Sequence, residues 1–420
     1  MSTEHSKRAA KFTVDVEKTT WHDATFWSVR QKRDKMAHEL PEWEDLRELA
    51  SEIKMHTITH LADYLDVFSK NLESRGVKVH WAKDAQEFNE IVLGILNDHH
   101  VKKMVKSKSM LTEECEMNPY LEKHGIDVVE TDLGERIIQL LGQKPSHIVM
   151  PAIHLKREEV GKMFEEKGIS KEIGNYDPTY LTRCARHHLR NQFMEAGAGM
   201  TGCNFGVAET GDCVVCTNEG NADMTTSMPK LHIVAMGIEK LVPDYKSLAV
   251  FQRLLCRCGT GQPTTAFTSH FRQARPGAEM HVVLVDNGRS DILADKDHWQ
   301  TLKCMRCGAC MNTCPVYRRS GGYSYTYFIP GPVGVNLGML KNPQKYADNV
   351  SACTLCLSCD NVCPSKVGPG SQIYVWRQSL DRLGKANPIK KAMSSGMEYL
   401  FDRPSLYTTA LKFAPLANLI

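Results

Sequence analysis

The stretches CMRCGACMNTCPVY (residues 304–317) and CTLCLSCDNVCPSK (residues 353–366) repeat one spacing of four cysteines, C-x2-C-x2-C-x3-C-P. Three cysteines on one tight turn can bind three corners of an iron–sulfide cube, because thiolate is a soft ligand that suits iron. Where two copies occur, the fourth cysteine of each copy characteristically binds the other cube. The spacing therefore predicts two [4Fe–4S] clusters. The first is assigned to Cys304, Cys307, Cys310 and Cys363, and the second to Cys353, Cys356, Cys359 and Cys314.

Zinc is the alternative occupant of such runs. Two C-x2-C pairs can bind zinc tetrahedrally, and a single four-cysteine run would leave that choice open. A zinc site usually uses two pairs, however, which leaves no role for the triple spacing or for the proline after the fourth cysteine. Two complete copies therefore favour clusters that accept and release single electrons. Residues 315–352 separate the runs by more than compact ferredoxins use, and this resembles the helical ferredoxin type of respiratory and disulfide-reducing complexes.

Length and composition limit the class of protein. The 420 residues allow two or three domains. Lysine plus arginine (52) nearly balances aspartate plus glutamate (49), so charge indicates neither nucleic acid nor an anionic membrane as a partner. The first residues hold no apolar core of a secretory signal, and no apolar run approaches the roughly 20 residues of a transmembrane span. We expect a cytoplasmic protein, at most peripheral to the inner face of the membrane, whose 15 cysteines serve metal or redox chemistry.

The hydrophobic pattern divides the chain into four segments. Residues 1–74 form an N-terminal helical segment, and at 75–293 apolar runs alternate with helical patterns, which predicts an α/β domain with a largely parallel sheet. Residues 294–380 form an α-helical dicluster ferredoxin domain, and residues 381–420 form a helical tail. We expect its last stretch, residues 410–420, to be a plain packed helix, and a docking helix or a surface-lying segment is the alternative. Within the α/β domain we predict one helix over residues 112–125, a strand over SHIVMPA (146–152) and a glycine-rich turn at GAGMTG (197–202).

Motifs for other cofactors do not occur. The sequence has no G-x-G-x-x-G after a strand, no Walker loop and no C-x-x-C-H haem site. The histidine pairs at 99–100 and 187–188 are interpreted as solvated or packed side chains, because adjacent side chains on a helix point apart. The cysteines outside the two runs are interpreted as buried thiols, and a redox role for the pair Cys256 and Cys258 is the weaker alternative.

Polar side chains follow two of the predicted strands. Lys106 and Lys108 stand at the end of one strand, and a second set follows another: Thr217, Asn218, Glu219 and Asn221. Ligands of open α/β sheets bind at the carboxyl ends of strands, so both sets together form a candidate pocket for a carboxylate or phosphate. The alternative is a hydrogen-bonded loop beside solvated lysines. No catalytic residue can be assigned from the sequence.

Four longer stretches carry a resemblance to a known family: KSKSMLTEE (106–114), ETDLGERIIQL (130–140), PSHIVMPAIH (145–154) and VAETGDCVVCTNEGNADMTTSMPKLHIVAMGIEKLVP (207–243). Together with the cysteine runs, they are similar to the lactate utilization protein B family, whose members combine a LUD domain with a two-cluster ferredoxin-type domain. The resemblance implies that the α/β domain has a fold like that of CoA-transferases and sugar isomerases. It also implies two partners: a CCG-type cysteine-rich iron–sulfur subunit and a second LUD-domain subunit. The electron acceptor is not implied.

We therefore expect an electron-transfer subunit of a complex that oxidises L-lactate to pyruvate, with electrons passing through two [4Fe–4S] clusters. The chain would then be a subunit of an oxidoreductase, with the substrate site in a partner or at an interface. Two alternatives stay open. One is an oxidoreductase subunit acting on another hydroxy acid or on a thiol–disulfide couple, and the other is a redox-sensing regulatory module, which the balanced charge does not favour.

Overall fold

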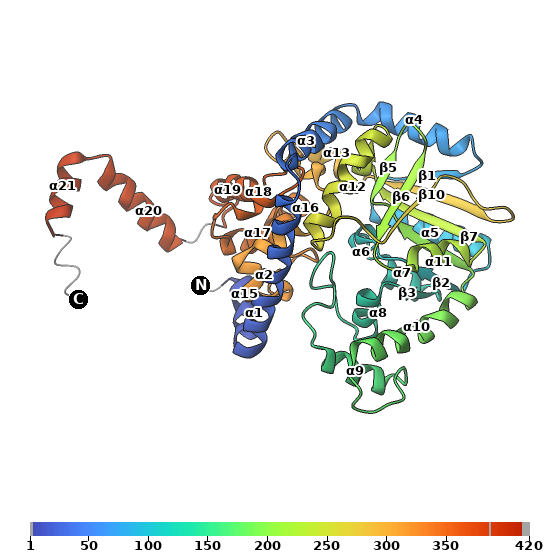
Figure 1. Cartoon of the computed structure of the whole chain (residues 1–420). Coiled ribbons are helices and arrows are strands. Elements are labelled where there is room, and N and C mark those ends of the chain that lie inside the picture. The colour runs from blue at the N-terminus through green and yellow to red at the C-terminus, as the bar shows by residue number, and fades with distance from the viewer. Residues whose placement is uncertain (1–2, 386–387, 414–420) are drawn as a thin grey trace.

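The computed structural model describes residues 3–385 and 388–413 of the chain. Figure 1 shows an α/β part, a helical part beside it that carries both cysteine runs, and two C-terminal helices that extend away from both. The chain is thus a mixed α/β structure followed by a helical region. None of the described helices is both long enough and apolar enough to span a bilayer.

A six-stranded parallel sheet forms the centre of the α/β part. Its order is β1 (Lys78–Ala82), β10 (Glu279–Val285), β7 (Leu231–Gly237), β4 (Ala198–Gly202), β2 (Lys103–Lys106) and β3 (Asp127–Glu130). Every residue of β7 and β4 is buried. Both faces of the sheet are covered, and this explains why these strands show no alternation of apolar and polar residues.

Different elements cover the two faces. On one face, Phe88, Val92 and Leu96 of α5 (Ala85–Asp98) pack with α7 (Met117–Lys123) against alternate strand residues. On the other face lie α4 (Leu61–Glu73) and a smaller sheet of order β8-β5-β6-β9. The smaller sheet consists of β8 (Leu241–Val242), β5 (Phe205–Val207), β6 (Asp212–Thr217) and β9 (Phe267–Phe271). The remaining helices of this part are α6 (Met110–Glu114), α8 (Leu133–Leu140), α9 (Arg157–Glu166), α10 (Pro178–Glu195), α11 (Asn221–Ser227) and α12 (Tyr245–Gly259).

The helical part is built from short helices around an aromatic and aliphatic core. Tyr317, Met311 and Ile373 are fully buried in it. Its elements are α13 (Arg289–Ala294), η2 (Trp299–Lys303), α14 (Ala309–Thr313), α15 (Pro315–Ser320), η3 (Gly322–Ser324), α16 (Gly331–Lys341), α17 (Pro343–Ala352), α18 (Ser358–Val362) and α19 (Pro369–Ser379). The first cysteine run contains α14 and the second contains α18, and these two helices pack together.

The N-terminal helices pack across the helical part. They are α1 (Glu4–Thr13), α2 (Val16–His38) and α3 (Trp43–Thr59). Phe26 of α2 is fully buried against Tyr317 and Ile148. Helix α2 packs on α14 and α15, and α3 packs on α12 and η2 (Figure 1). Residues from the start of the chain therefore complete the core around the cysteine runs. The four segment limits predicted from the sequence stay predictions.

Three local predictions are wrong. Residues 146–152 form turns instead of a strand, because this apolar segment is buried against the helical part: Tyr317 Oη donates to Ser146 O at 2.7 Å, and His147 Nε2 lies 3.0 Å from Asn312 Oδ1. The glycine-rich stretch 197–202 contains strand β4, whose small residues admit a close backbone, since a Cβ on Gly199 would lie 1.8 Å from Thr225 O. The helix over 112–125 is broken into α6 and α7 at Glu116, which has a left-handed φ of 51°.

The C-terminal tail differs from the expected packed helix. Helices α20 (Pro388–Phe401) and α21 (Pro404–Phe413) contact each other and stand away from the body (Figure 1). Large apolar side chains along them are exposed: Ile389, Met393, Met397, Tyr399, Phe401, Leu406, Tyr407 and Leu411. The last part of the expected helix, residues 414–420, lies outside the described residues.

Candidate functional site

The two cysteine runs adopt the same unusual backbone conformation. Arg306 and Gly308 follow the first cysteine by two and four residues, with φ of 62° and 81°. Leu355 and Leu357 occupy the equivalent positions in the second run, with φ of 56° and 57°. A side chain beyond Cα disfavours the left-handed region, so three non-glycine residues held there mark an over-determined turn.

The cysteines group by space and not by run. Burial, with the neighbouring Cys304, Cys307 and Cys363, raises the pKa of the Cys310 thiol well above its usual value. Cys363 belongs to the second run, yet its neighbours are ligands of the first set. Burial raises the pKa of Cys314 to about 11, and its thiol neighbours are Cys353 and Cys356 of the second run. The positions of Cys363 and Cys314 are those that crossed ligand sets require, whereas Cys359 has Cys310 and Cys314 as thiol neighbours, one from each predicted set.

Backbone donors point at several of these sulfur atoms. The amide of Arg306 lies 3.4 Å from Cys304 Sγ, that of Leu355 lies 3.3 Å from Cys353 Sγ, and that of Val367 lies 3.3 Å from Cys363 Sγ. A buried thiolate needs such donors, and hydrogen bonds to sulfur tune a bound cluster. The donor set of four thiols with aligned amides fits a [4Fe–4S] cluster in each group.

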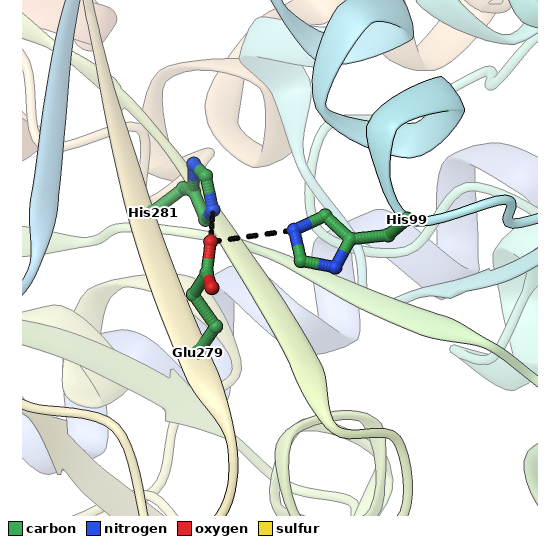
Figure 2. A group of neighbouring side chains, drawn as sticks. All are labelled: His99, Glu279 and His281. Atoms are coloured by element: carbon green, nitrogen blue, oxygen red, sulfur yellow. Dashed lines mark hydrogen bonds and ion pairs between the residues drawn. The ribbon is translucent and has the colours of Figure 1, made fainter.

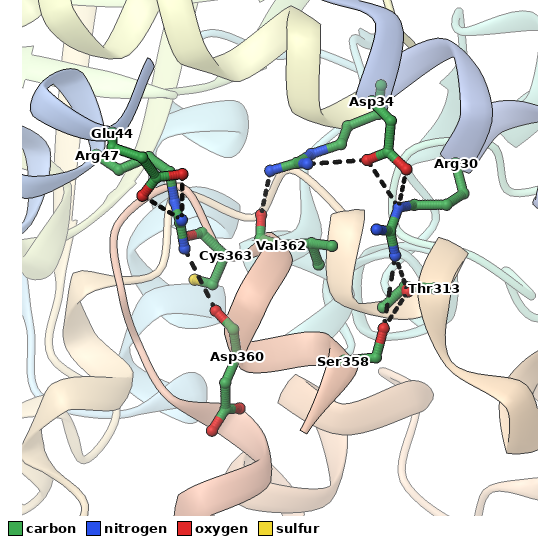
Figure 3. A network of polar contacts seen from close by, with 10 residues as sticks. Arg30, Asp34, Glu44, Arg47, Thr313, Ser358, Asp360, Val362 and Cys363 are labelled. Atoms are coloured by element: carbon green, nitrogen blue, oxygen red, sulfur yellow. Dashed lines mark hydrogen bonds and ion pairs between the residues drawn. The ribbon is translucent and has the colours of Figure 1, made fainter. Parts of the chain in front are cut away.

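Arginines of the N-terminal helices fasten both runs (Figure 3). Arg47 of α3 donates to Cys363 O from Nε at 3.1 Å and from Nη2 at 2.9 Å. Arg30 of α2 binds Asp34 through Nε and contacts Thr313 and Ser358, whose hydroxyls lie 2.6 Å apart across the two runs. These bonds hold the two runs at a fixed separation.

A cavity of ≈ 330 Å³ lies where the α/β part meets the first cysteine run. Its lining includes the carboxyl ends of β2, β4, β6 and β7, and on the other side Arg306, Cys307 and Ile329. Five of the six residues predicted for the pocket line it: Lys108, Thr217, Asn218, Glu219 and Asn221. Two segments more than 100 residues apart therefore meet at the edge of the sheet, next to a predicted cluster ligand.

Lys106 is the exception and does not line the cavity. Its side chain is 1% exposed, and Nζ lies 2.7 Å from Glu130 Oε1 and 3.0 Å from Glu113 Oε1. Burial lowers the pKa of Lys106, but the two carboxylates outweigh burial and hold the pKa above its usual value. Lys106, the last residue of β2, is held by carboxylates of β3 and α6, whereas Lys108 lies beyond the end of the strand and lines the cavity.

Acidic and polar groups form one end of the cavity. Glu219 Oε2 accepts from the amide of Leu133 at 3.2 Å. Burial, reinforced by Asp132, raises the pKa of Glu219 to about 7. Lys108 donates to Val149 O at 2.5 Å. This end can therefore both donate and accept protons or hydrogen bonds near neutral pH.

The other end holds residues that the sequence reasoning missed. Lys240 and Arg306 line it, together with Arg289 and its partners Glu114 and Glu239. The position of Arg306 inside the cysteine run was the available signal. The sequence around Lys240 carried no such signal, because only the folded sheet places this side chain at the cavity.

Several cysteines outside the runs adjoin this region. Cys258 is fully buried, and Cys307 and Arg33 are its neighbours. Cys256 and Cys216 line the cavity wall. Their positions at the cavity were not foreseen, and Cys258 lies beside a predicted ligand without belonging to either set of four.

A separate group of possible metal ligands lies at the opposite ends of the strands. Figure 2 shows the rings of His99 and His281 directed at the carboxylate of Glu279. Their ligand atoms lie within 4.8 Å of one another. Lys78 Nζ, however, lies 2.5 Å from Glu279 Oε1, and this hydrogen bond, with His281, lowers the pKa of Glu279 to about 2. Lys78 already neutralises the carboxylate, so we assign the group to an ion-pair network.

Comparisons with known proteins agree with this division of the chain. Residues 65–290 match the LUD domain family, and residues 300–367 match the 4Fe-4S dicluster domain family. Lactate utilization protein B of Oceanobacillus iheyensis is 40% identical over 397 residues, which cover 92% of this chain and 82% of the relative. The proteins of the same name from Geobacillus thermodenitrificans and Macrococcus caseolyticus are each 42% identical, over 90% and 92% of this chain and 81% and 82% of their own lengths. A solved DUF162 family protein from Deinococcus radiodurans is 13% identical and covers 54% of this chain and 98% of its own, with a TM-score of 0.31.

Proposed function

Because the chain belongs to the lactate utilization protein B family and has its iron–sulfur role in lactate utilization, we propose that it is the electron-transfer subunit of an L-lactate-oxidising complex. The observation that supports the proposal is that Cys363 of the second run lies near thiols of the first run, and Cys314 of the first run lies near Cys353 and Cys356. When bound, two [4Fe–4S] clusters would supply one-electron transfer, and oxidation of lactate to pyruvate releases two electrons.

The chain's own residues contribute rigidity around these sites. Arg30 and Arg47 fix the two runs relative to each other. The first set faces the cavity through Cys307, while Cys356 of the second set is exposed. This arrangement gives one set access to a bound molecule and the other access to a protein surface.

The proposal extends to the partner subunits of the complex and to the fold class of the α/β part. The partners would be a CCG-type cysteine-rich iron–sulfur subunit and a second LUD-domain subunit, with an unidentified electron acceptor and a cytoplasmic location. The exposed apolar side chains of α20 and α21 support a docking surface, because apolar side chains gathered on a surface mark interaction sites. We assign the α/β part to the fold class of CoA-transferases and sugar isomerases, which an experimental structure of this part would test.

The test is anaerobic purification of the chain with its partners, followed by iron and sulfide analysis and EPR spectroscopy before and after L-lactate. We expect about eight irons per chain and a reduced-cluster signal that appears on addition of lactate. Clusters that stay oxidised with lactate and become reduced with another hydroxy acid or a dithiol would instead support the alternative substrates. Zinc in place of iron would refute the proposal.

A further inference from the structure

We propose that the cavity beside the first cysteine run binds a small organic carboxylate of the 2-hydroxy acid or 2-oxo acid class, with Lys240 and Arg306 holding its carboxylate group. The inference rests on the proposed function for the identity of the acid. It goes beyond that function by placing the binding site on this chain instead of on a partner.

Two cations at the cavity form no close ion pair with a carboxylate of the described residues, although the Glu239 carboxylate acts electrostatically on both. Arg306 and Lys240 both line the cavity, and no carboxylate of the described residues lies within 4.0 Å of either side chain. Arg306 Nη1 is buried and has no hydrogen-bond partner among the described residues. A buried guanidinium nitrogen without a partner is costly, and a carboxylate is a natural partner because it can accept two parallel hydrogen bonds.

The nearest carboxylates are already engaged. Arg289 donates from Nε to Glu239 Oε2 at 2.5 Å, and from Nη1 and Nη2 to the two oxygens of Glu114 at 3.0 Å each. At this end of the cavity, three cations therefore face two carboxylates. One added monocarboxylate would balance the charge, and the ion pairs of Arg289 keep Glu114 and Glu239 from filling that place.

The strand that leads to these residues is shaped to hold the ion pairs in position. Gly237 ends β7, and a Cβ there would lie 2.2 Å from Glu239 Oε2 and 2.8 Å from Arg289 Nε. Any larger residue would displace the network that leaves Lys240 free. Lys54 donates to Leu241 O at 3.2 Å and also contacts Glu239 O, which fixes the backbone on both sides of Lys240.

The rest of the wall suits a small organic acid. Ile148, Leu255 and Ile329 offer apolar surface for an alkyl group. The volume of ≈ 330 Å³ lies within the range of small-molecule sites of about 300–1,000 Å³. A combination of apolar walls and a few convergent polar groups is typical of such sites.

A competing explanation for the two cations is that they offset the negative charge of the cluster. Lys240 lies near Cys304, and Arg306 lies between Cys304 and Cys307 in the chain, so both cations would also offset thiolate charge. That role alone predicts changed cluster potentials without a ligand. The carboxylate role predicts saturable binding that depends on the same two side chains.

The test measures equilibrium binding of radiolabelled L-lactate and pyruvate to the cluster-loaded chain, purified anaerobically. We expect saturable binding to the wild type and a loss of affinity of about 10- to 100-fold in Lys240→Met and in Arg306→Gln, as expected for a charge-assisted hydrogen bond. Lys240→Arg keeps the charge and should bind within a few-fold of the wild type. The matched control is Lys303→Met, since Lys303 is 5% exposed, has Cys363 as a charged neighbour and does not line the cavity.

Wild-type binding alone can overturn the inference, so a variant that fails to fold does not leave it undecided. Absence of saturable binding by a chain that carries its full iron content would refute it. Tighter binding of inorganic phosphate than of either acid would also refute it, as would equal affinity in the Lys240→Met variant. If lactate reduces the clusters only when partners are present while the isolated chain binds no acid, the inference fails and the proposed function stands.

Discussion

Crossed ligation can be tested by combining two cysteine substitutions. The pair Cys314→Ala with Cys356→Ala removes two ligands of the same predicted set, although the residues lie in different runs. The pair Cys314→Ala with Cys307→Ala removes one ligand from each set, although both residues lie in the first run. The two double variants therefore give opposite results under crossed and uncrossed ligation.

The expected magnitudes come from the neighbours of each thiol. Cys314 has Cys353 and Cys356 beside it, whereas Cys310 has Cys307 and Cys363. With about four irons per cluster, the wild type should hold about eight irons per chain. The first double variant should keep about four, and the second should hold close to none.

The assay is iron and acid-labile sulfide analysis after anaerobic purification, with EPR spectroscopy of the dithionite-reduced protein. Cys184→Ala is the matched control, because Cys184 lies in α10 outside both sets, and this variant should keep all its iron. The reverse order of iron contents would refute crossed ligation: close to none in the Cys314 and Cys356 pair, and about four in the Cys314 and Cys307 pair.

Other predictions concern the buried network and the packing. Arg289→Met should lower the free energy of unfolding by about 3–5 kcal/mol in chemical denaturation, because two buried carboxylates lose their cation; a change below about 1 kcal/mol would contradict this. Arg289 overcomes the effect of burial and lowers the pKa of Glu239 to about 2. This carboxylate therefore stabilises the fold above its unfolded pKa of 4.5, and the contribution should be lost as the pH falls toward 2, which thermal melting at decreasing pH would show. Arg47→Gln should speed iron release to a chelator because a buried carbonyl loses two donors, whereas Glu44→Gln, on its exposed partner, should leave the rate unchanged. Gly199→Ala should destabilise the chain by about 1–3 kcal/mol in the same denaturation assay, because its Cβ would overlap a carbonyl oxygen of α11.

Short-range features of the sequence were sufficient to predict much of the fold. Apolar runs of four to seven residues alternating with helical patterns predicted the strands that became β1, β2, β3, β7 and β10. The errors arose where packing outweighs local pattern. The apolar residues 146–152 resemble a buried strand, but they bury themselves against α2 and the helical part. The glycines at 197–202 resemble a turn, but they are needed where α11 lies on the sheet.

Part of the candidate site could also be predicted from the sequence, and part of it could not. The positions of Lys108 and Thr217 at strand ends could be inferred from the sequence, but Thr217 ends β6 of the smaller sheet, and only the folded chain brings it to the cavity beside Lys108. The burial of Lys106 could not, since it depends on Glu130 arriving from the adjacent strand. Lys240 and Arg306 come from segments 66 positions apart, and only the folded chain brings them to one cavity.

The sequence by itself determined the chemistry of the cysteine runs, because cluster ligands on one turn are a matter of spacing within a dozen residues. It also determined the alternation of strands and helices, which depends on the local period of apolar residues. The tertiary structure alone decided that α2 and α3, from the start of the chain, fasten runs that lie 283 and 316 residues later. It also decided that the cavity opens beside Cys307. Such contacts depend on shape, burial and charge between distant segments, and no local pattern encodes them.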